Sequence, residues 1–289
     1  MSEFQNKIDF TVLFTVEKAN PNGDPLTGNR PREDFSGFGE VSDVCIKRKI
    51  RNRLQDMGED IFVQSEDRCD DGCKSLNDRI KNNEAVQKAM KTKNQSLIMD
   101  ETCKAWIDVR SFGQVLAFKG DGKESGVSIG IRGPVSIQTS SSASPIDVTS
   151  MQITKSVGNE TNANGKRSSD TMGMKHRVEF GLYTIKGSIN CQLAEKTGFS
   201  KEDAEKIKQA LISLFENDAS SARPEGTMEV RKLYWWVHQN KTGQYSSAKV
   251  HRALHVELKA GIEMASKYED YEIYVDDLDN LVREEYEGI

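Results

Sequence analysis

The apolar positions along the chain recur with the two periods that mark strands and helices. Residues 8–16, IDFTVLFTV, are β-branched and aromatic, which is typical of a short buried strand. Apolar residues then return at helical spacing from Val44 to Leu54, behind a candidate N-cap at Ser42 or Asp43. The same reasoning predicts a helix over 201–217, capped by Ser200, and strands over 127–139, 177–192, 230–238 and 252–258.

The residues between these elements are more polar and divide the chain into unequal parts. Residues 59–105 are lysine-rich with helical pieces, and we interpret them as an insertion. Residues 151–175 have a centre of Asn, Gly, Ser and charged residues, which indicates a protruding arm with a flexible tip. The order β, α, insertion, β, arm, β, α, β predicts an α+β fold with a ferredoxin-like sheet of the RNA-recognition-motif type. The parts of this palm are expected at 1–58, 106–150 and 176–289.

Four further expectations concern short segments. Residues 103–109 are expected to be helical, and residues 139–150, TSSSASPIDVTS, to form a loop. The acidic C-terminal residues are expected to form a solvated tail helix. Trp235 and Trp236 should point to opposite faces of a strand, so one of them is expected in the core.

Composition and charge limit the class of protein. The five cysteines are an odd number, and the N-terminus has neither a basic nor an apolar signal region, so reduced thiols in a cytoplasmic protein are expected. No apolar run approaches the ~20 residues that span a bilayer, so no membrane partner is expected. Residues 261–289 hold ten acids and two bases, so this tail carries −8 of the net charge of −5 and leaves +3 for the remaining chain. The overall acidity therefore does not argue against nucleic-acid binding elsewhere.

Candidate binding chemistry begins in the loop that follows the first strand, NPNGDPLTGNRPR, at residues 20–32. Asparagine and glycine tolerate left-handed backbone and proline fixes φ, so a stiff loop is expected. Its amides and arginine forks would suit phosphate oxygens, although a well-ordered turn with solvated arginines is the alternative. The candidate RNA-binding residues here are Asn20, Asn22, Asn29, Arg30 and Arg32.

Two later segments add basic candidates. The helix VCIKRKIRNRL could follow a row of phosphates with Lys47, Arg48 and Arg51, or it could simply have a solvated basic face. The DVRSFG segment at 108–113 could orient Arg110 toward RNA, and it could equally form a structural salt bridge beside a core phenylalanine.

The arm supplies a third group of candidates. Lys155, Lys175 and Arg177 give it a basic bias. Met151 adds a flexible side chain that could wedge between bases. Apolar residues alternate on both flanks, so a hairpin base is predicted. These features suit a clamp over RNA, and the alternative is an ordinary surface loop.

Taken together, these segments resemble one known family. The loop NPNGDPLTGNRPR, the helix VCIKRKIRNRL, the DVRSFG segment and the strand IRGPVSIQTS follow one another in the backbone subunits of type I-C CRISPR interference complexes. These subunits belong to the repeat-associated superfamily. The resemblance extends over most of the chain and is most specific in the first 140 residues.

The resemblance implies a hand-shaped, non-catalytic protein. Its palm would be a modified RNA-recognition motif, its fingers the insertion at 59–105 and its thumb a β-hairpin at 151–175. Its partners would be CRISPR guide RNA, the target DNA strand paired with the guide, further copies of itself in a helical filament and the other Cascade subunits. No catalytic residue, cofactor or metal is implied. The chain lacks the aromatic signature of ordinary RNA-recognition motifs, which agrees with contacts to the RNA backbone.

Three alternatives stay open at this point. Type III backbone subunits cut target RNA in a metal-dependent reaction, using an aspartate near the first strand and helix, and Asp24 and Asp34 are available here. A general single-stranded RNA-binding protein would share the basic segments. A zinc module is the third, but the usual Cys-x-x-Cys spacing is absent. Its candidate ligands are Cys69, Cys73, His251 and His255.

Overall fold

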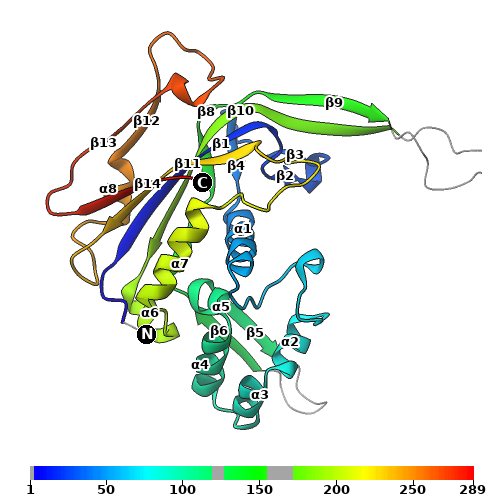
Figure 1. The fold of residues 1–289 in the computed structure, drawn as a ribbon, viewed down its shortest axis with the longest axis vertical. Helices are drawn as coiled ribbons and strands as arrows, with labels where there is room; N and C mark the ends of the chain where they lie inside the picture. The colour runs from blue at the N-terminus through cyan, green and yellow to red at the C-terminus, as the bar shows by residue number, and fades with distance from the viewer. Residues whose placement is uncertain (1–2, 119–126, 155–171) are drawn as a thin grey trace, which may run out of the picture.

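The computed structural model describes residues 3–118, 127–154 and 172–289, and its centre is an antiparallel sheet (Figure 1). The first strand, β1 (Ile8–Ala19), lies in the middle of this sheet between β10 (Met172–Ile189) and β11 (Met228–Val237). The strand order is β14-β11-β1-β10-β8-β4, and β7 and β9 also pair with β10. The remaining strands of this sheet are β4 (Phe38–Val41), β7 (Val135–Ile137), β8 (Ser140–Pro145), β9 (Val148–Thr154) and β14 (Val282–Glu287).

Other elements cover both faces of the sheet. Because the residues of a strand alternate between its two faces, each central strand contributes side chains to two cores. Phe10 and Phe14 of β1 pack in the core with three helices, α1 (Asp43–Asp56), α6 (Cys191–Thr197) and α7 (Lys201–Ile212). Leu13 packs on the other face, with α8 (Ser247–Arg252) and the two-stranded sheet of β12 (Leu254–Leu258) and β13 (Tyr271–Val275). Consequently both Trp235 and Trp236 are buried, one in each core, where the sequence required only one.

A second unit follows α1 and forms its own hydrophobic cluster, from Phe62 to Ile131. We call residues 59–132 the finger unit. The cluster includes Leu116 and Ile129, so strands assigned from sequence to the palm pack with the insertion. The elements of the unit are η2 (Glu66–Arg68), α2 (Leu76–Asn82), α3 (Glu84–Lys91), α4 (Gln95–Ala105), α5 (Ile107–Phe112), β5 (Gly113–Phe118) and β6 (Val127–Arg132).

One of the local predictions was wrong, and two were confirmed only with an interruption. The expected strand over 127–139 is broken at Gly133 and Pro134, so that β6 pairs with β5 and β7 pairs with β10. The expected loop over 139–150 forms β8 and β9, because alternate serines are small enough to be buried; the Ser144 hydroxyl lies 2.7 Å from that of Tyr271. The expected helix over 103–109 is interrupted at Trp106, which has an extended backbone.

The acidic C-terminal segment is also not a helix. Its residues form β13 and β14, in which more buried positions alternate with exposed ones. In β13, Tyr271 and Ile273 pack inward while Glu272 is exposed. Strand β14 pairs with β11 and so closes one end of the main sheet.

The arm is a hairpin of β9 and the first half of β10, as the sequence predicted for its base. Seven residue pairs join the two strands, from Met172↔Thr154 to Val178↔Val148. Figure 1 shows the hairpin extending away from the body above β2 (Gly23–Asp24) and β3 (Arg30–Pro31), with the finger unit at the other end of the molecule. Residues 155–171, including the candidate Lys155 and the expected flexible tip, lie outside the described residues.

Candidate nucleic-acid interface

Two asparagines of the loop at 20–32, Asn20 and Asn22, hold the loop together through side-chain hydrogen bonds. Asn20 is buried, and its Nδ2 donates to the carbonyl oxygen of Asn29 at 2.7 Å. The Asn22 Oδ1 accepts from the backbone N–H and the hydroxyl of Ser42, both at 2.9 Å. Ser42 in turn caps α1, so the loop and the start of the helix are fixed to each other.

The loop closes as a small hairpin of β2 (Gly23–Asp24) and β3 (Arg30–Pro31), with the turn η1 (Pro25–Thr27) between them. Gly28 and Asn29 both have positive φ, which the sequence anticipated from their conformational tolerance. A Cβ on Gly23 would collide with the Asn29 side chain, so this position requires glycine. The prediction of a stiff loop is therefore confirmed.

The two arginines of the loop are only partly paired. Arg30 Nη1 donates to Ser150 Oγ of β9 at 3.0 Å, and its Nε lies 3.5 Å from a Glu33 carboxylate oxygen. Arg32 Nη2 lies 3.4 Å from Asp24 Oδ1. The Arg30 side chain is 36% exposed, so this arginine is braced and yet accessible.

Arg51 of α1, by contrast, points into the protein. Arg51 Nε donates to Asp108 Oδ2 at 2.9 Å, and the carboxylate of Asp108 is only 1% exposed. Asp108 also accepts the backbone N–H groups of Phe62 and Val63, at 2.7 and 3.1 Å. The Arg51 guanidinium lies over the Phe112 ring, 5.0 Å from its centroid. The salt bridge beside a core phenylalanine is thus present, with Arg51 as the cation.

The other basic residues of α1 differ in exposure. Arg48 Nη1 donates to the Val63 carbonyl oxygen at 2.6 Å. Lys49 is buried in an ion pair with Asp218, and this burial lowers the pKa of its ammonium group. Lys47 lies on the surface in an i,i+4 pair with Asp43 at 2.9 Å. Neither a wholly solvated face nor a continuous row of free cations describes this helix.

Arg110 also has a partner inside the protein. Its Nε and Nη2 donate to the two carboxylate oxygens of Asp203, at 3.0 and 2.8 Å. Asp203 completes the capping box of α7 with Ser200, so the pair joins the finger unit to that helix. Contact of Arg110 with RNA stays a prediction.

The hairpin has two distinct faces, because residues directly opposite each other share a face. Met151 and Lys175 are paired on one face, which continues to Arg177; the guanidinium of Arg177 lies 2.9 Å from Glu179. The other face bears Met172 and Met174, which are 69% and 55% exposed. This second face is the one that meets Arg30 at its base, through Ser150.

The comparison with protein families decides the identity. Residues 6–276 match the sequence model of the family described as CRISPR-associated protein Cas7. The chain belongs to the Cas7 family. This confirms the resemblance at the level of the family.

Individual relatives of this Cas7 family member are distant. It is 26% identical over 228 residues to the CRISPR-associated protein Cas7 of Haloferax volcanii, which covers 75% of the chain and 66% of that relative. The match thus spans just under two thirds of that relative's length. Among solved structures it is similar to a chain titled CRISPR RNA-guided surveillance complex, pre-nicking (15% identity, TM-score 0.46, 83% and 81% of the two chains). A chain titled CRISPR RNA-guided surveillance complex gives 15% identity and a TM-score of 0.45, over 83% and 76%.

The candidate ligands of a zinc site are not brought together in this Cas7 chain. Cys69 Sγ lies 3.9 Å from Arg79 in the finger unit, whereas His251 binds the Gly187 carbonyl oxygen and His255 pairs with Asp276. Among the described residues, no three His, Cys, Asp or Glu side chains are grouped so that they could hold a metal ion. Over the same residues, no helix is long and apolar enough to cross a membrane.

The aspartates available for a nuclease alternative act as local caps. Asp24 Oδ1 accepts the Leu26 N–H at 3.1 Å and faces Arg32. Asp34 Oδ1 accepts from Ser36 and Phe38, at 2.8 and 2.9 Å. Each carboxylate therefore stabilises a turn of the loop region.

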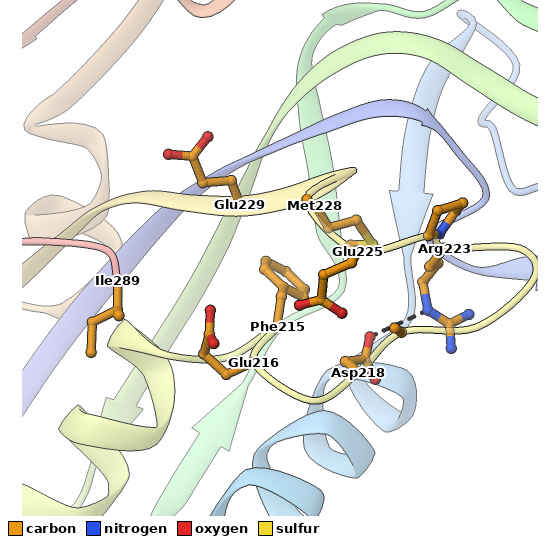
Figure 2. Close-up of a pocket in the computed structure, with 11 residues that line it drawn as sticks. Phe215, Glu216, Asp218, Arg223, Glu225, Met228, Glu229 and Ile289 are labelled. Atoms are coloured by element: carbon orange, nitrogen blue, oxygen red, sulfur yellow. Dashed lines mark hydrogen bonds and ion pairs between the residues drawn. The ribbon is translucent and has the colours of Figure 1, made fainter.

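A cavity of about 220 Å³ is lined by residues between 215 and 229 together with Ile289, and the same segment contacts the loop at 20–32 through the Ala222 carbonyl oxygen, which accepts the Asn20 N–H. Figure 2 shows Asp218 paired with Arg223 at one side, with Glu216, Glu225 and Glu229 around the space. Three exposed carboxylates disfavour an approaching phosphate. The partly free arginines of the loop are therefore the better candidates for nucleic-acid contact.

Sequence reasoning missed two residues at this interface, Ser150 and His176. The Ser150 hydroxyl lies 2.8 Å from His176 Nδ1, and it also accepts from Arg30. Ser150 is 120 positions from Arg30, so only the strand register brings them together. Ser150 was visible only as a polar position in the expected loop over 139–150, and His176 only as a polar position of the palm directly after the expected arm.

Proposed function

We propose that this Cas7 family chain is a non-catalytic subunit of a type I-C Cascade complex. It binds the backbone of CRISPR guide RNA, oligomerises along it and presents the spacer for pairing with target DNA. The observation that carries this proposal is the position of Arg30: a stiff loop and the base of a projecting hairpin hold it while leaving it accessible. Membership of the Cas7 family supports the same assignment.

In this proposal the central sheet with its helices is a ferredoxin-like palm of the RNA-recognition-motif type. The finger unit at 59–132 corresponds to the fingers, since its hydrophobic cluster extends beyond residue 105. The hairpin of β9 and β10 corresponds to the thumb, and Figure 1 shows it leaving the body at the opposite end from the fingers. Helix α1 and the loop at 20–32 lie between the two in that view.

The RNA-contacting residues are those whose cations stay accessible. Arg30, Arg32 and Lys47 are partly exposed on the loop and on the first turns of α1. On the hairpin, Lys175 lies on one face and the exposed methionines Met172 and Met174 lie on the other. We assign Arg51 and Arg110 to holding the interface in place, because each is committed to a nearly buried carboxylate.

The proposal is tested by the RNA that accompanies the protein. Expression with a CRISPR array should yield a discrete small RNA species that co-purifies with the chain and is protected from added nuclease. The binding constant should fall with salt by roughly 0.7 in log–log slope for each phosphate neutralised on a single strand. Recovery of RNA of all lengths would favour a general RNA-binding protein instead.

The non-catalytic part of the proposal has a separate test. Labelled RNA and DNA incubated with the purified chain and Mg²⁺ or Mn²⁺ should stay intact, since Asp24 is occupied as a turn cap. Cleavage that disappears in Asp24→Ala would replace this proposal with a metal-dependent nuclease.

A further inference from the structure

The joint between β3 and the hairpin brings three polar side chains to one exposed point. Arg30 Nη1 is 3.0 Å from Ser150 Oγ, and that same oxygen is 2.8 Å from His176 Nδ1. Ser150 and His176 are directly opposite in the β9–β10 ladder, so they share a face, and β3 packs against β10 beside them. The three groups therefore meet where the loop touches the arm.

The hydrogens on these three groups determine which donors have no partner within this chain of hydrogen bonds. A guanidinium only donates, so the Ser150 oxygen must accept from Arg30. When the hydroxyl proton is given to His176 Nδ1, the neutral ring carries its own proton on Nε2. No contact to a described residue is seen for His176 Nε2 or for Arg30 Nη2. In this arrangement, the part of the chain that the structure describes offers no acceptor to these two donors, which lie on adjacent side chains.

The surroundings favour an oxygen anion as the missing acceptor. Among the described residues, the carboxylate that approaches Arg30 is that of Glu33, on the Nε side at 3.5 Å, and Nη1 donates to Ser150, so Nη2 is left to another partner. A phosphate group offers unshared oxygens to a guanidinium and to a neighbouring N–H at the same time. Phosphate contacts from Arg, Ser and His side chains set the register of a protein on nucleic acid without reading its sequence.

We propose that Arg30, Ser150 and His176 form one anion site, which binds a backbone phosphate of the guide RNA at the base of the arm. The inference rests on the proposed function and adds two residues to it. Arg30 and His176 donate directly to the phosphate. Ser150 is a positioning residue: it orients the guanidinium and fixes the tautomer of the imidazole. Since Ser150 and His176 belong to the arm and Arg30 to the loop, the phosphate also ties the arm to the loop.

The experiment measures affinity and salt slope for a guide-length single-stranded RNA with six forms of the full chain. These are the wild type, Arg30→Ala, Ser150→Ala, the double variant of these two, His176→Phe and the matched control Thr154→Ala. Thr154 lies on the same face of the hairpin, further from the body, and is exposed. All four substituted positions are at least partly exposed, so thermal unfolding should show that every variant stays folded.

Arg30→Ala should weaken binding about tenfold and lower the salt slope by roughly 0.7, as loss of one charged contact requires. Ser150→Ala and His176→Phe should each weaken binding about three- to tenfold at an unchanged slope, because the guanidinium charge remains. Adding Ser150→Ala to Arg30→Ala should cost much less than it does in the wild type, since Ser150 acts through Arg30.

Two results would overturn the site. Ser150→Ala and His176→Phe could bind RNA as Thr154→Ala does, or the losses from Arg30→Ala and Ser150→Ala could simply add. Either result, with normal RNA binding by the wild type, removes the anion site and leaves the proposed function intact. A wild type that does not bind RNA at all removes the proposed function, and the site with it.

Discussion

Two arginines that look alike in the sequence, Arg30 and Arg51, have opposite surroundings. Arg51 lies on α1 against a carboxylate that is almost completely buried, and its side chain is 13% exposed. Arg30 lies on β3, where it contacts Ser150 and, at 3.5 Å, Glu33, and 36% of its side chain is exposed to solvent. A basic run on a helix therefore does not by itself mark a nucleic-acid footprint. What decides the role is whether the protein supplies a carboxylate for each cation.

The inward cations of α1 connect parts of the molecule that are distant in sequence. Arg51 reaches Asp108 of α5, and Lys49 reaches Asp218 in the segment after α7. Asp108 also holds the start of the finger unit through two backbone N–H groups. Helix α1 thus connects the palm to the finger unit through these ion pairs, whereas the arginines of the loop at 20–32 are partly exposed.

The largest effect is expected from removing the Asp108 carboxylate, which links α1 to the finger unit. Asp108→Ala leaves Arg51 and two buried N–H groups without an acceptor, so unfolding free energy should fall by about 3–5 kcal/mol. Urea unfolding followed by circular dichroism measures this change. The control is Lys47→Ala, which removes a surface pair and should cost no more than about 0.5 kcal/mol. Equal losses in the two variants would contradict the distinction between inward and outward cations.

The same distinction predicts that stability and RNA affinity separate. Arg30→Ala should lower RNA affinity about tenfold while changing the unfolding free energy by less than about 0.5 kcal/mol. Arg51→Ala should show the reverse, a clear loss of stability with an RNA affinity within about twofold at a temperature where the protein stays folded. Filter binding and urea unfolding on the same preparations provide both numbers. A tenfold loss of RNA affinity in folded Arg51→Ala would return α1 to the RNA surface.

Alkaline pH offers a smaller effect in the finger core that Asp108 borders. Burial raises the pKa of the Cys103 thiol from 9.0 to about 12. The native state then retains a proton that the unfolded chain has lost, so the stability from this group is present below pH 9 and is lost as pH rises through 12. Between pH 9 and 11, Cys103→Ala should show a stability–pH slope weaker by about one proton than the wild type. Identical slopes would show that the thiol titrates normally.

The smallest effect is expected at Lys49, although it is the most buried cation of α1. Its partner Asp218 is also held by Arg223 at 3.2 Å, so removal of the ammonium group leaves no orphaned carboxylate. Replacement of a buried charge by an apolar side chain of similar size is often neutral. Lys49→Met should therefore change the unfolding free energy by less than about 1 kcal/mol, measured as for Asp108→Ala. A loss as large as that of Asp108→Ala would mean that Arg223 cannot replace Lys49.

Much of the fold followed from periodicity alone, because the segments concerned bury one apolar face. Strand β1 and helices α1 and α7 lie where their patterns predicted them, and the arm has the predicted hairpin base. The patterns failed where the buried side chains are not apolar. Strand β8 buries serines, and in β14 the half-buried positions are Glu284 and Tyr286, so its alternation is not one of apolar and polar residues.

The candidate interface could be predicted only in part, for a different physical reason. The stiffness of the loop at 20–32 follows from its local sequence, so it was accessible without a structure. The direction of Arg51 depends on Asp108, and that of Arg110 on Asp203, which lies 93 positions away. The partnership of Ser150 with His176 depends on strand register. No spacing within one segment encodes such contacts between distant segments.

Strand β10 gives the arm the mechanics of a cantilever. Residues 178–189 of this single strand are anchored to β1, and residues 172–178 continue outward with β9 over roughly 20 Å. A load on the outer end of the arm is therefore delivered to the β1–β10 ladder at the centre of the molecule and not to a linker at its surface. The direction of the arm therefore depends on the core. A substitution in the packing beneath β10 would change that direction, as would a substitution in the arm itself.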